Sequence, residues 1–355
     1  MGVKKMNKIR VFDFFSGCGG TSQGFKQAGF DVVFGLDFDR DASESFRLNF
    51  PEATIVNDDI RTISCDTISH LFDLEENDGY TLFSGCAPCQ PYSKQNSNRK
   101  EDDPRLDLLS EFCRFVAYYL PDFVFVENVP GLQKFNQNEG TFKNFLNTLI
   151  GYGYSVDFNI IPAAWFGVPQ TRERLVLLAS KKWKVKLPVK THGTLDTPYS
   201  TVREWIGDLP PIVAGAKHAT IPDHESARLT DINIQRIKAT PEGGGREAWP
   251  QALVLKCHQN HKGHTDVYGR LSWDKPASGL TTRCISYSNG RFGHPVQNRA
   301  LSLREAACLQ TFPMDYLFTG SLQSRARQIG NAVPPKMSEA IAKQIIKLIS
   351  PSFGC

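Results

Sequence analysis

Short runs of apolar, β-branched and aromatic residues recur along the first half of the chain, separated by polar stretches with helical spacing. The runs that predict strands cover residues 9–15, 32–36, 80–83, 123–126, 160–163 and 175–179. The stretches that predict helices cover residues 40–49, 105–119 and 141–151. Strands that alternate with helices are typical of an α/β fold, in which a mostly parallel sheet carries helices on both faces.

The pattern changes at about Leu187, where Pro, Gly and His become frequent and the periodicity weakens. Helical spacing returns over residues 302–310 and 335–349. The sequence therefore predicts two domains: a first made of residues 1–187 and 322–355, and a smaller, loop-rich second of residues 188–321.

Length and composition are those of a folded chain. It has 355 residues, of which 41% are apolar and 22% charged, so it can bury a sizeable core without metal or disulfide support. Its longest apolar runs are far shorter than the ~18 residues that a membrane span needs, and the basic N-terminus leads into no signal-peptide core. Nine cysteines, an odd number without an export signal, predict reduced thiols in the cytoplasm.

Charge is distributed unevenly around a formal net charge of +4. Residues 1–169 carry 15 Lys and Arg against 23 Asp and Glu, whereas residues 170–298 carry 19 against 11. A basic half next to an acidic one is compatible with a nucleic-acid partner and also with an ordinary solvated surface.

A glycine-rich turn follows the first predicted strand, in the sequence DFFSGCGG at residues 13–20. Glycines there let the backbone turn sharply and approach a ligand. Asp37 and Phe38 end the second strand, where a carboxylate suits ribose hydroxyls and a ring suits adenine. Asp59 stands near the end of a third strand. Three acidic strand ends in order favour a nucleoside-bearing cofactor over a simple tight turn.

Cys86 and Cys89 form a CxxC pair just after the strand at residues 80–83. Such a pair is compatible with a redox dithiol, with one nucleophilic cysteine or with two inert thiols. Pro88 and Pro91 flank Cys89, which is at best neutral for the helix that a redox CxxC usually opens. The next strand delivers Glu127, a carboxylic acid that favours the nucleophile.

Six sequence blocks carry a resemblance to a known family. They are DFFSGCGG, GCAPCQPYS, ENV, QTRER, SLREAACLQTFP and QIGNAVPP. In this order they resemble the DNA cytosine-5 methyltransferase family, in its compact bacterial or phage modification type. The resemblance implies a Rossmann-like, S-adenosylmethionine-dependent methyltransferase domain and a smaller target-recognition domain. It also implies transfer of a methyl group to carbon 5 of cytosine in a specific double-stranded DNA sequence.

The resemblance assigns catalytic roles to four residues. It implies that the Cys89 thiolate adds to carbon 6 of a cytosine that has been flipped out of the duplex. Glu127 matches the residue that binds the ring nitrogen and amine, and Arg174 the residue that holds the carbonyl. Arg172 serves the site or a phosphate, or else makes a structural ion pair.

The same resemblance implies positions for the cofactor and the DNA. Those for S-adenosylmethionine are Phe15, Ser16, Gly17, Gly19, Asp37, Phe38, Asp59, Ile60, Pro88 and Asn331. Those predicted for DNA are Ser93 and Arg99 in a closing loop, and Arg270, Arg283 and Arg291 in the recognition domain. Cys257, His258, His261 and His264 fit no standard zinc spacing, so no metal site is predicted.

Two other activities remain open at this stage. A transfer-RNA methyltransferase would use the same chemistry, and a thiol oxidoreductase would use Cys86 and Cys89. The partners expected are double-stranded DNA, bound by a monomer, and a cognate restriction endonuclease.

Overall fold

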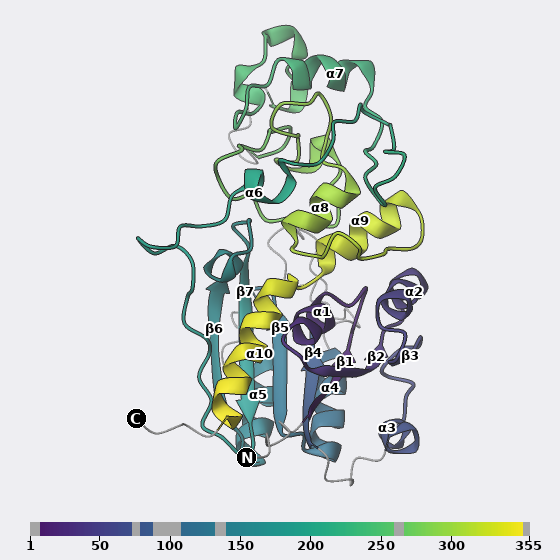
Figure 1. Cartoon of the computed structure of the whole chain (residues 1–355), viewed down its shortest axis with the longest axis vertical. Helices are drawn as coiled ribbons and strands as arrows, with labels where there is room; N and C mark the ends of the chain where they lie inside the picture. The colour runs from purple at the N-terminus through teal and green to yellow at the C-terminus, as the bar shows by residue number, and fades with distance from the viewer. Residues whose placement is uncertain (1–7, 73–78, 88–107, 132–139, 259–265, 351–355) are drawn as a thin grey trace, which may run out of the picture. The chain divides into compact units, whose positions relative to one another are not determined.

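A computed structural model of the chain describes residues 8–72, 79–87, 108–131, 140–258 and 266–350. The chain divides into two compact units (Figure 1). Unit 1 consists of Met1–Pro162, Glu173–Val189 and Pro335–Cys355, and unit 2 of Ala163–Arg172 and Lys190–Pro334.

Unit 1 is built on a seven-stranded sheet of order β3-β2-β1-β4-β5-β7-β6. Its strands are β1 (Lys8–Phe14), β2 (Asp31–Leu36), β3 (Thr54–Val56), β4 (Gly79–Gly85), β5 (Phe123–Asn128), β6 (Ser155–Pro162) and β7 (Glu173–Ser180). Strands β1 to β5 pair in parallel, and β7 runs antiparallel to β5 and β6. The prediction of a mostly parallel α/β fold is confirmed.

Helices cover both faces of this sheet (Figure 1). They are α1 (Gly20–Gln27), α2 (Arg40–Asn49), α3 (Asp66–Leu71), α4 (Leu108–Tyr119), α5 (Thr141–Gly151) and α10 (Pro335–Ile349). On one face, Phe112 of α4 and Phe145 of α5 join the main core cluster with Phe14 of β1. On the other, Phe25 of α1 meets Phe125 of β5 edge to face, with 5.6 Å between ring centroids.

The strand order creates a switch point between β1 and β4. After β1 the chain builds β2 and β3 on one side, and then returns so that β4 pairs with the opposite edge of β1. Phe14 and Gly85 are opposite each other at the carboxyl ends of these strands. In open α/β sheets, ligands bind beyond the carboxyl ends at such a point. The loops after β1 and β4 are therefore where a site is expected.

Helices α1 and α10 pack closely because Gly24 has no side chain. A Cβ at Gly24 would lie 2.1 Å from the backbone oxygen of Pro335 and 2.2 Å from the hydroxyl of Ser338. We expect Gly24→Ala to destabilise unit 1 by about 1–3 kcal/mol, since overpacking forces the helices apart. Gly151→Ala is the matched control, because no atom lies within 4 Å of that Cβ position. Urea unfolding followed by circular dichroism compares the two, and equal midpoints would contradict the expectation.

Unit 2 has short helices joined by long loops. The helices are α6 (Val202–Ile206), α7 (Asp231–Lys238), α8 (Leu303–Leu309) and α9 (Leu322–Asn331). The 3₁₀ turns are η4 (Ala163–Phe166), η5 (Arg246–Ala248), η6 (Gln251–Leu253), η7 (Lys256–His258) and η8 (Tyr287–Asn289). Over the described part of this unit, strand pairing is limited to isolated bridges. This agrees with the loop-rich character expected from the sequence.

The units divide the chain at different places from the predicted domains. The long run of unit 2 begins after Val189, near the predicted residue 187, but α9 and residues 163–172 also belong to unit 2. The cause is long-range hydrogen bonding: the side-chain amide of Gln310 donates to the carbonyls of Ile329 and Ala332, and Arg172 donates to that of Leu280. Whether unit 2 recognises DNA remains a prediction.

Candidate active site

The loop after β1 has an unusual backbone. Phe15, Gly17 and Gly19 lie in the left-handed region, with φ values of 61°, 53° and 91°. The Ser16 amide donates to the Leu36 carbonyl at the end of β2 (2.9 Å), and the Gly19 amide donates to the Ser16 carbonyl (2.8 Å). The glycines permit this turn, and the two bonds fix the loop beside β2.

Asp37 is held rigidly at the end of β2. Its Oδ2 accepts from the Gly17 amide (2.8 Å), and its Oδ1 accepts from the Asp39 amide (2.9 Å). Burial raises the pKa of Asp37 to about 6, although both of these hydrogen bonds act in the opposite direction. The adjoining Phe38 is 71% exposed. A fixed carboxyl group thus lies beside an open aromatic ring.

These residues fit the nucleoside end of the predicted cofactor. The buried Ser16 hydroxyl has no hydrogen-bond partner within the described ranges. A Cβ at Gly17 would meet no atom within 4 Å, so the backbone there is open to a ligand. The exposed Phe38 ring offers a stacking surface. An orphaned hydroxyl, an open backbone and a free ring are what a bound nucleoside would complete.

The other residues predicted to bind the cofactor have differing surroundings. Asp59 is engaged by Arg61, whose hydrogen bonds lower the pKa of Asp59. Ile60 is 2% exposed, with its side chain in the core. Asn331 is the exposed last residue of α9, in unit 2. Pro88 lies outside the described residues.

Glu127 and Arg174 form an ion pair at the end of the sheet that holds the predicted site. They come from the neighbouring strands β5 and β7, and Arg174 Nε lies 2.9 Å from Glu127 Oε1. Their side chains are only 17% and 9% exposed for Arg174 and Glu127, respectively. Burial lowers the pKa of Arg174, and the Glu127 carboxylate opposes that shift. The prediction that both contribute to one site is therefore compatible with their placement.

Cys89 lies outside the described residues, but the segment that leads to it is described. The side-chain amide of Asn128 donates to the Ala87 carbonyl over 3.1 Å, which ties the end of β5 to this segment. Asn128 was not among the predicted site residues, although it is the second residue of the ENV block. Burial raises the pKa of the half-buried Cys86, with Glu127 and Asp13 adding to the rise.

The environment of Cys86 weighs against a redox dithiol. Reactive thiols have lowered pKa values and are accessible, and the pKa of Cys86 is shifted the other way. The cysteines that the structure describes are all free thiols: Cys18, Cys65, Cys86, Cys113, Cys257, Cys284 and Cys308.

Arg172 is buried in unit 2, where it binds backbone carbonyls. It is 4% exposed, and its Nη1 donates to the carbonyls of Leu280 (2.9 Å) and Gly330 (3.0 Å). These contacts join parts of the chain that are more than 100 residues apart in sequence. The placement favours the structural role for Arg172 over contact with the base.

Arg270 is buried, which speaks against the DNA contact that we predicted for it. Its side chain is 3% exposed, and it donates to the carbonyls of Ile237, Thr240, His294 and Gln297. A buried guanidinium needs acceptors for its donors, and the protein's own backbone supplies them.

The other two arginines predicted to read bases differ in their exposure and in the number of their hydrogen bonds within the protein. Arg291 is 23% exposed, and it donates to Asp266 and to the carbonyls of Gly243 and Gly244. Arg283 is exposed, and its guanidinium donates to the side-chain amide oxygen of Asn289 (3.3 Å). Of the two, Arg283 is therefore the more accessible for the predicted contact with DNA. Ser93 and Arg99 lie outside the described residues.

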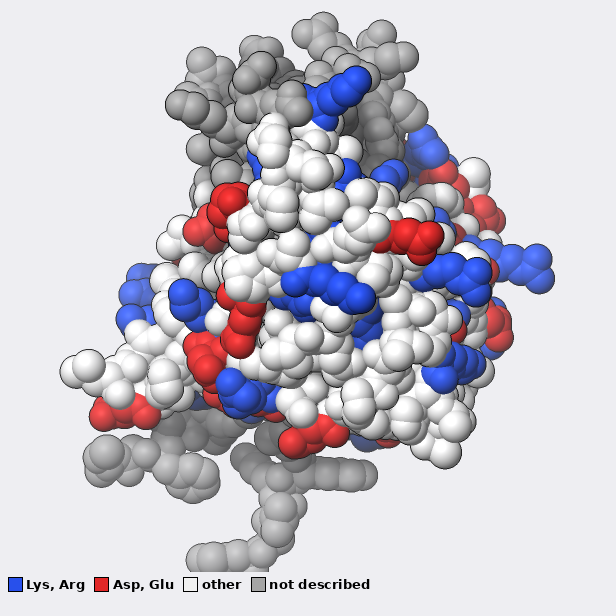
Figure 2. Space-filling model, turned by 90° about the horizontal axis from the view of Figure 1, so that it is seen from above, with Lys and Arg blue, Asp and Glu red and all other residues white. Residues whose placement is uncertain are grey.

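Surface charge does not form a single basic region on the face that Figure 2 presents. Its described atoms show Lys and Arg interspersed with Asp and Glu. The excess of basic residues at 170–298 is therefore not gathered into one patch on this face. Within the described ranges, no group of three His, Cys, Asp or Glu side chains could hold a metal. His261 and His264 lie outside those ranges.

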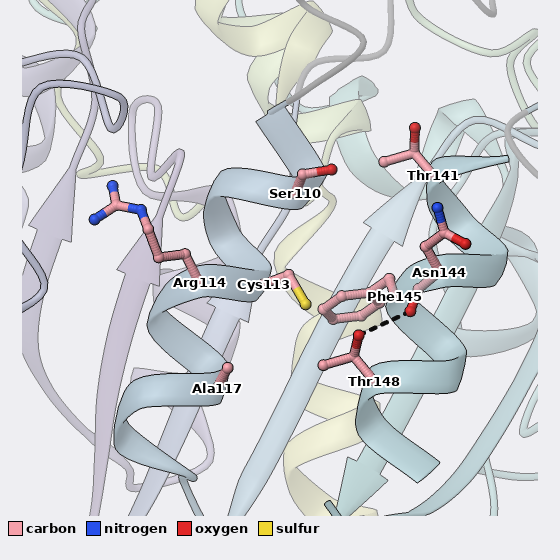
Figure 3. Close-up of a pocket in the computed structure, with 8 residues that line it drawn as sticks. All are labelled: Ser110, Cys113, Arg114, Ala117, Thr141, Asn144, Phe145 and Thr148. Atoms are coloured by element: carbon pink, nitrogen blue, oxygen red, sulfur yellow. Dashed lines mark hydrogen bonds between the residues drawn. The ribbon is translucent and has the colours of Figure 1, made fainter. Parts of the chain in front are cut away.

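A hollow of about 270 Å³ lies between α4 and α5 (Figure 3). Cys113 and Thr148 point into it from the two helices. Thr148 donates its hydroxyl to the Asn144 carbonyl over 2.9 Å. The described residues of the predicted site do not line this hollow. It is therefore separate from the part of the predicted site that the structure describes.

Comparisons with known proteins identify the family to which the chain is similar. The family described as C-5 cytosine-specific DNA methylase matches residues 9–347. The Type II methylase M.HgiDII of Herpetosiphon aurantiacus is 39% identical over 351 residues, covering 96% of this chain and 95% of the relative. The Type II methyltransferase M1.HphI of Haemophilus parahaemolyticus is 33% identical over 344 residues, covering 96% and 87%.

Solved structures share the fold. A prophage-encoded protein of E. coli superposes with a TM-score of 0.76 at 23% identity, covering 96% of this chain and 99% of its own. The Dnmt2 methyltransferase of S. pombe superposes with a TM-score of 0.59 at 19% identity, covering 96% and 100%. Across the described residues, no helix is both long and apolar enough to span a membrane. The family match over nearly the whole chain and the two bacterial relatives establish that this chain belongs to the C-5 cytosine-specific DNA methylases and is a DNA cytosine-5 methyltransferase.

Proposed function

We propose that the enzyme transfers a methyl group from S-adenosylmethionine to carbon 5 of cytosine in a specific double-stranded DNA sequence, through a covalent bond between Cys89 and a flipped-out base. The observation that carries the proposal is the Glu127–Arg174 pair at the carboxyl end of β5 and the amino end of β7, with the segment leading to Cys89 tied to the same end of β5. The fixed Asp37 and the open Phe38 ring support a nucleoside-bearing methyl donor.

The chemistry requires carbon 5 to become nucleophilic. The Cys89 thiolate forms a bond to carbon 6, which turns carbon 5 into an enamine-like carbon. S-adenosylmethionine supplies an electrophilic methyl group on a sulfonium. Once carbon 5 carries the methyl group, it loses its proton to a base, the Cys89–carbon 6 bond breaks and the ring regains its aromaticity.

Glu127 and Arg174 supply the polar part of this reaction. The Glu127 carboxyl binds the ring nitrogen and the exocyclic amine, and it provides acid as negative charge develops on the ring. Arg174 donates to the cytosine carbonyl and keeps Glu127 oriented through their ion pair. Because both groups are largely shielded from water, their hydrogen bonds to the base are stronger than exposed ones would be.

A mechanism-based trap tests the covalent step without knowledge of the recognised sequence. The probe is a PCR product in which 5-fluorodeoxycytidine replaces deoxycytidine throughout. Fluorine cannot leave as the proton does, so the enzyme and S-adenosylmethionine should give an adduct that survives denaturation and maps to Cys89. Cys89→Ala should form none, whereas Cys86→Ala should form it.

Two results would contradict the proposal. One is methylated DNA accumulating without an adduct, and the other is an adduct at a different cysteine. Parallel reactions with tritiated S-adenosylmethionine and either genomic DNA or total transfer RNA identify the substrate. Label on RNA alone would overturn double-stranded DNA as the substrate. The expected solution state is a monomer, and a cognate restriction endonuclease is the expected partner.

A further inference from the structure

A group of polar side chains, four of them buried and one half-buried, lies between the sheet and the first turn of α1. Its members come from β1, α1 and the region at and just after the end of β4: Asp13, Thr21, Ser22, Ser84 and Cys86. We call it the α1 polar cluster. Asp13, Ser22 and Ser84 are each 0% exposed, and Thr21 is 4% exposed. Burying a carboxyl group under a helix is costly unless it is paired, so its presence calls for a physical reason.

The cluster joins the two ends of the glycine loop. The Ser22 hydroxyl donates to Asp13 Oδ2 over 2.6 Å. Asp13 is the penultimate residue of β1 and precedes the loop. Ser22 is in the first turn of α1 and follows the loop. This bond therefore fixes the distance between the two ends of the loop. Ser84 is opposite Asp13 in the β1–β4 register and lies beside the same carboxyl.

A second contact links this loop to the segment that leads to Cys89. Thr21 Oγ1 lies 3.6 Å from Cys86 Sγ. Thr21 precedes Ser22 in the same helical turn, so α1 is tied at consecutive residues to β1 and to the chain beyond β4. The predicted cofactor loop and the predicted catalytic segment thus share one anchor.

The anchor adds side-chain contacts to the backbone bonds of Ser16 and Gly19 that hold the loop beside β2. Gly19, the N-cap of α1, makes no side-chain capping bond and has a φ of 91°. The loop also carries left-handed residues at Phe15 and Gly17. Glycine permits many backbone conformations, so the side chains on either side of the loop must select one.

We propose that Asp13 is a positioning residue for the methyl donor: its hydrogen bond with Ser22 closes the glycine loop, and the Thr21–Cys86 contact aligns that loop with the segment leading to Cys89. The inference rests on the proposed function, because the loop is the one assigned to S-adenosylmethionine. Asp13 itself acts through the loop and contacts neither substrate.

The carboxyl group of Asp13 is expected to be mostly neutral below about pH 7. Burial raises the pKa of Asp13 from 3.8 to about 7, and the Asp37 carboxylate adds to the rise, while hydrogen bonds from Ser22 and Ser84 oppose it. The other titratable group near it, Cys86, has a raised pKa and stays a thiol. The unfolded chain ionises Asp13 near pH 4, so the native state loses stability as the pH rises from about 4 to about 7. Asp13→Asn, which is always neutral, should flatten this decline.

Equilibrium binding of S-adenosylhomocysteine, the demethylated donor, tests the positioning role in the absence of DNA. Calorimetry should show Asp13→Asn binding within about threefold of the unmodified enzyme, and Asp13→Ala binding about tenfold or more weakly, the penalty of a lost buried hydrogen bond. Ser22→Ala should also weaken binding. In methyl transfer, Asp13→Ala should raise the KM for S-adenosylmethionine far more than it lowers kcat.

The control is Asp122→Ala, at the opposite end of the sheet. Asp122 is similarly shielded, with a side chain 14% exposed, and it accepts a hydrogen bond from the Thr81 amide over 2.9 Å. The Asp122→Ala variant should have a lower melting temperature but an unchanged affinity for S-adenosylhomocysteine. The inference fails if Asp13→Ala binds S-adenosylhomocysteine as tightly as the unmodified enzyme does. It also fails if Asp122→Ala weakens this binding as much as Asp13→Ala does. If Asp13→Ala does not fold, Ser22→Ala decides by the same criterion. An unmodified enzyme that neither binds this ligand nor methylates DNA would instead overturn the proposed function.

Discussion

Glu127→Gln is expected to lower the rate of methyl transfer to DNA by about 10²- to 10⁴-fold, the range typical for loss of a general acid or base. The amide keeps the size of the side chain but cannot supply a proton to the ring. It also leaves Arg174, 17% exposed, without its carboxylate partner 2.9 Å away. Initial rates with tritiated S-adenosylmethionine and saturating genomic DNA measure the loss.

Glu173→Gln is the matched control for this variant. Glu173 precedes Arg174 in β7, and its side chain is exposed. Only its backbone carbonyl accepts from Arg174, over 2.7 Å, so the same substitution should leave the rate unchanged. Melting curves establish that both variants are folded. A Glu127→Gln enzyme with more than about a tenth of the original rate would argue against a proton-transfer role.

Glu305→Ala is expected to destabilise unit 2 by about 3–5 kcal/mol, because it leaves a buried arginine without its partner. Arg299 and Glu305 are 0% and 1% exposed and make two hydrogen bonds of 2.7 Å each. Burial opposes ionisation of Glu305, but the bonds from Arg299 hold the pKa of Glu305 below its ordinary value. Glu305 also accepts from the Ser302 amide and completes the capping box of α8.

Two further variants test whether the lost stability comes from an unpaired buried charge rather than from removal of any ion pair. Asp274→Ala removes a partner from the exposed pair with Arg203 and should change stability little. Replacing both buried partners, as Arg299→Met with Glu305→Leu, should recover much of the stability lost by Glu305→Ala, since no unpaired charge remains. Urea unfolding followed by tryptophan fluorescence compares them. A Glu305→Ala midpoint equal to that of Asp274→Ala would contradict the expectation.

The sequence predicted the elements of unit 1 well because burial leaves a local signature. Strands covered on both faces read as unbroken apolar runs, and β2, β5 and β7 coincide with such runs to within about two residues. The helical stretches at 40–49 and 141–151 coincide with α2 and α5. Edge strand β6 begins at Ser155, five residues before the predicted run, because its first residues alternate polar and apolar and so form no unbroken apolar run.

The arginines show where sequence reasoning stops. Arg172, Arg270 and Arg283 look alike in the sequence, each a basic residue in a polar or glycine-containing stretch. The structure buries the first two among backbone carbonyls up to 158 residues away and leaves the third exposed. No local spacing encodes such partners, so the sequence cannot separate an arginine that holds the fold from one that is free to bind DNA.

The amino-acid sequence alone determined the α/β fold, the glycine loop, the acidic strand ends and the family, because these depend on local periodicity and on short contiguous blocks. Only the tertiary structure decided that α9 and residues 163–172 belong to unit 2, that Arg174 pairs with Glu127, and that Asp13 is buried beneath α1. Each of these depends on side chains brought together by the order of strands in the sheet or by long-range hydrogen bonds, and burial then fixes which charges must be paired.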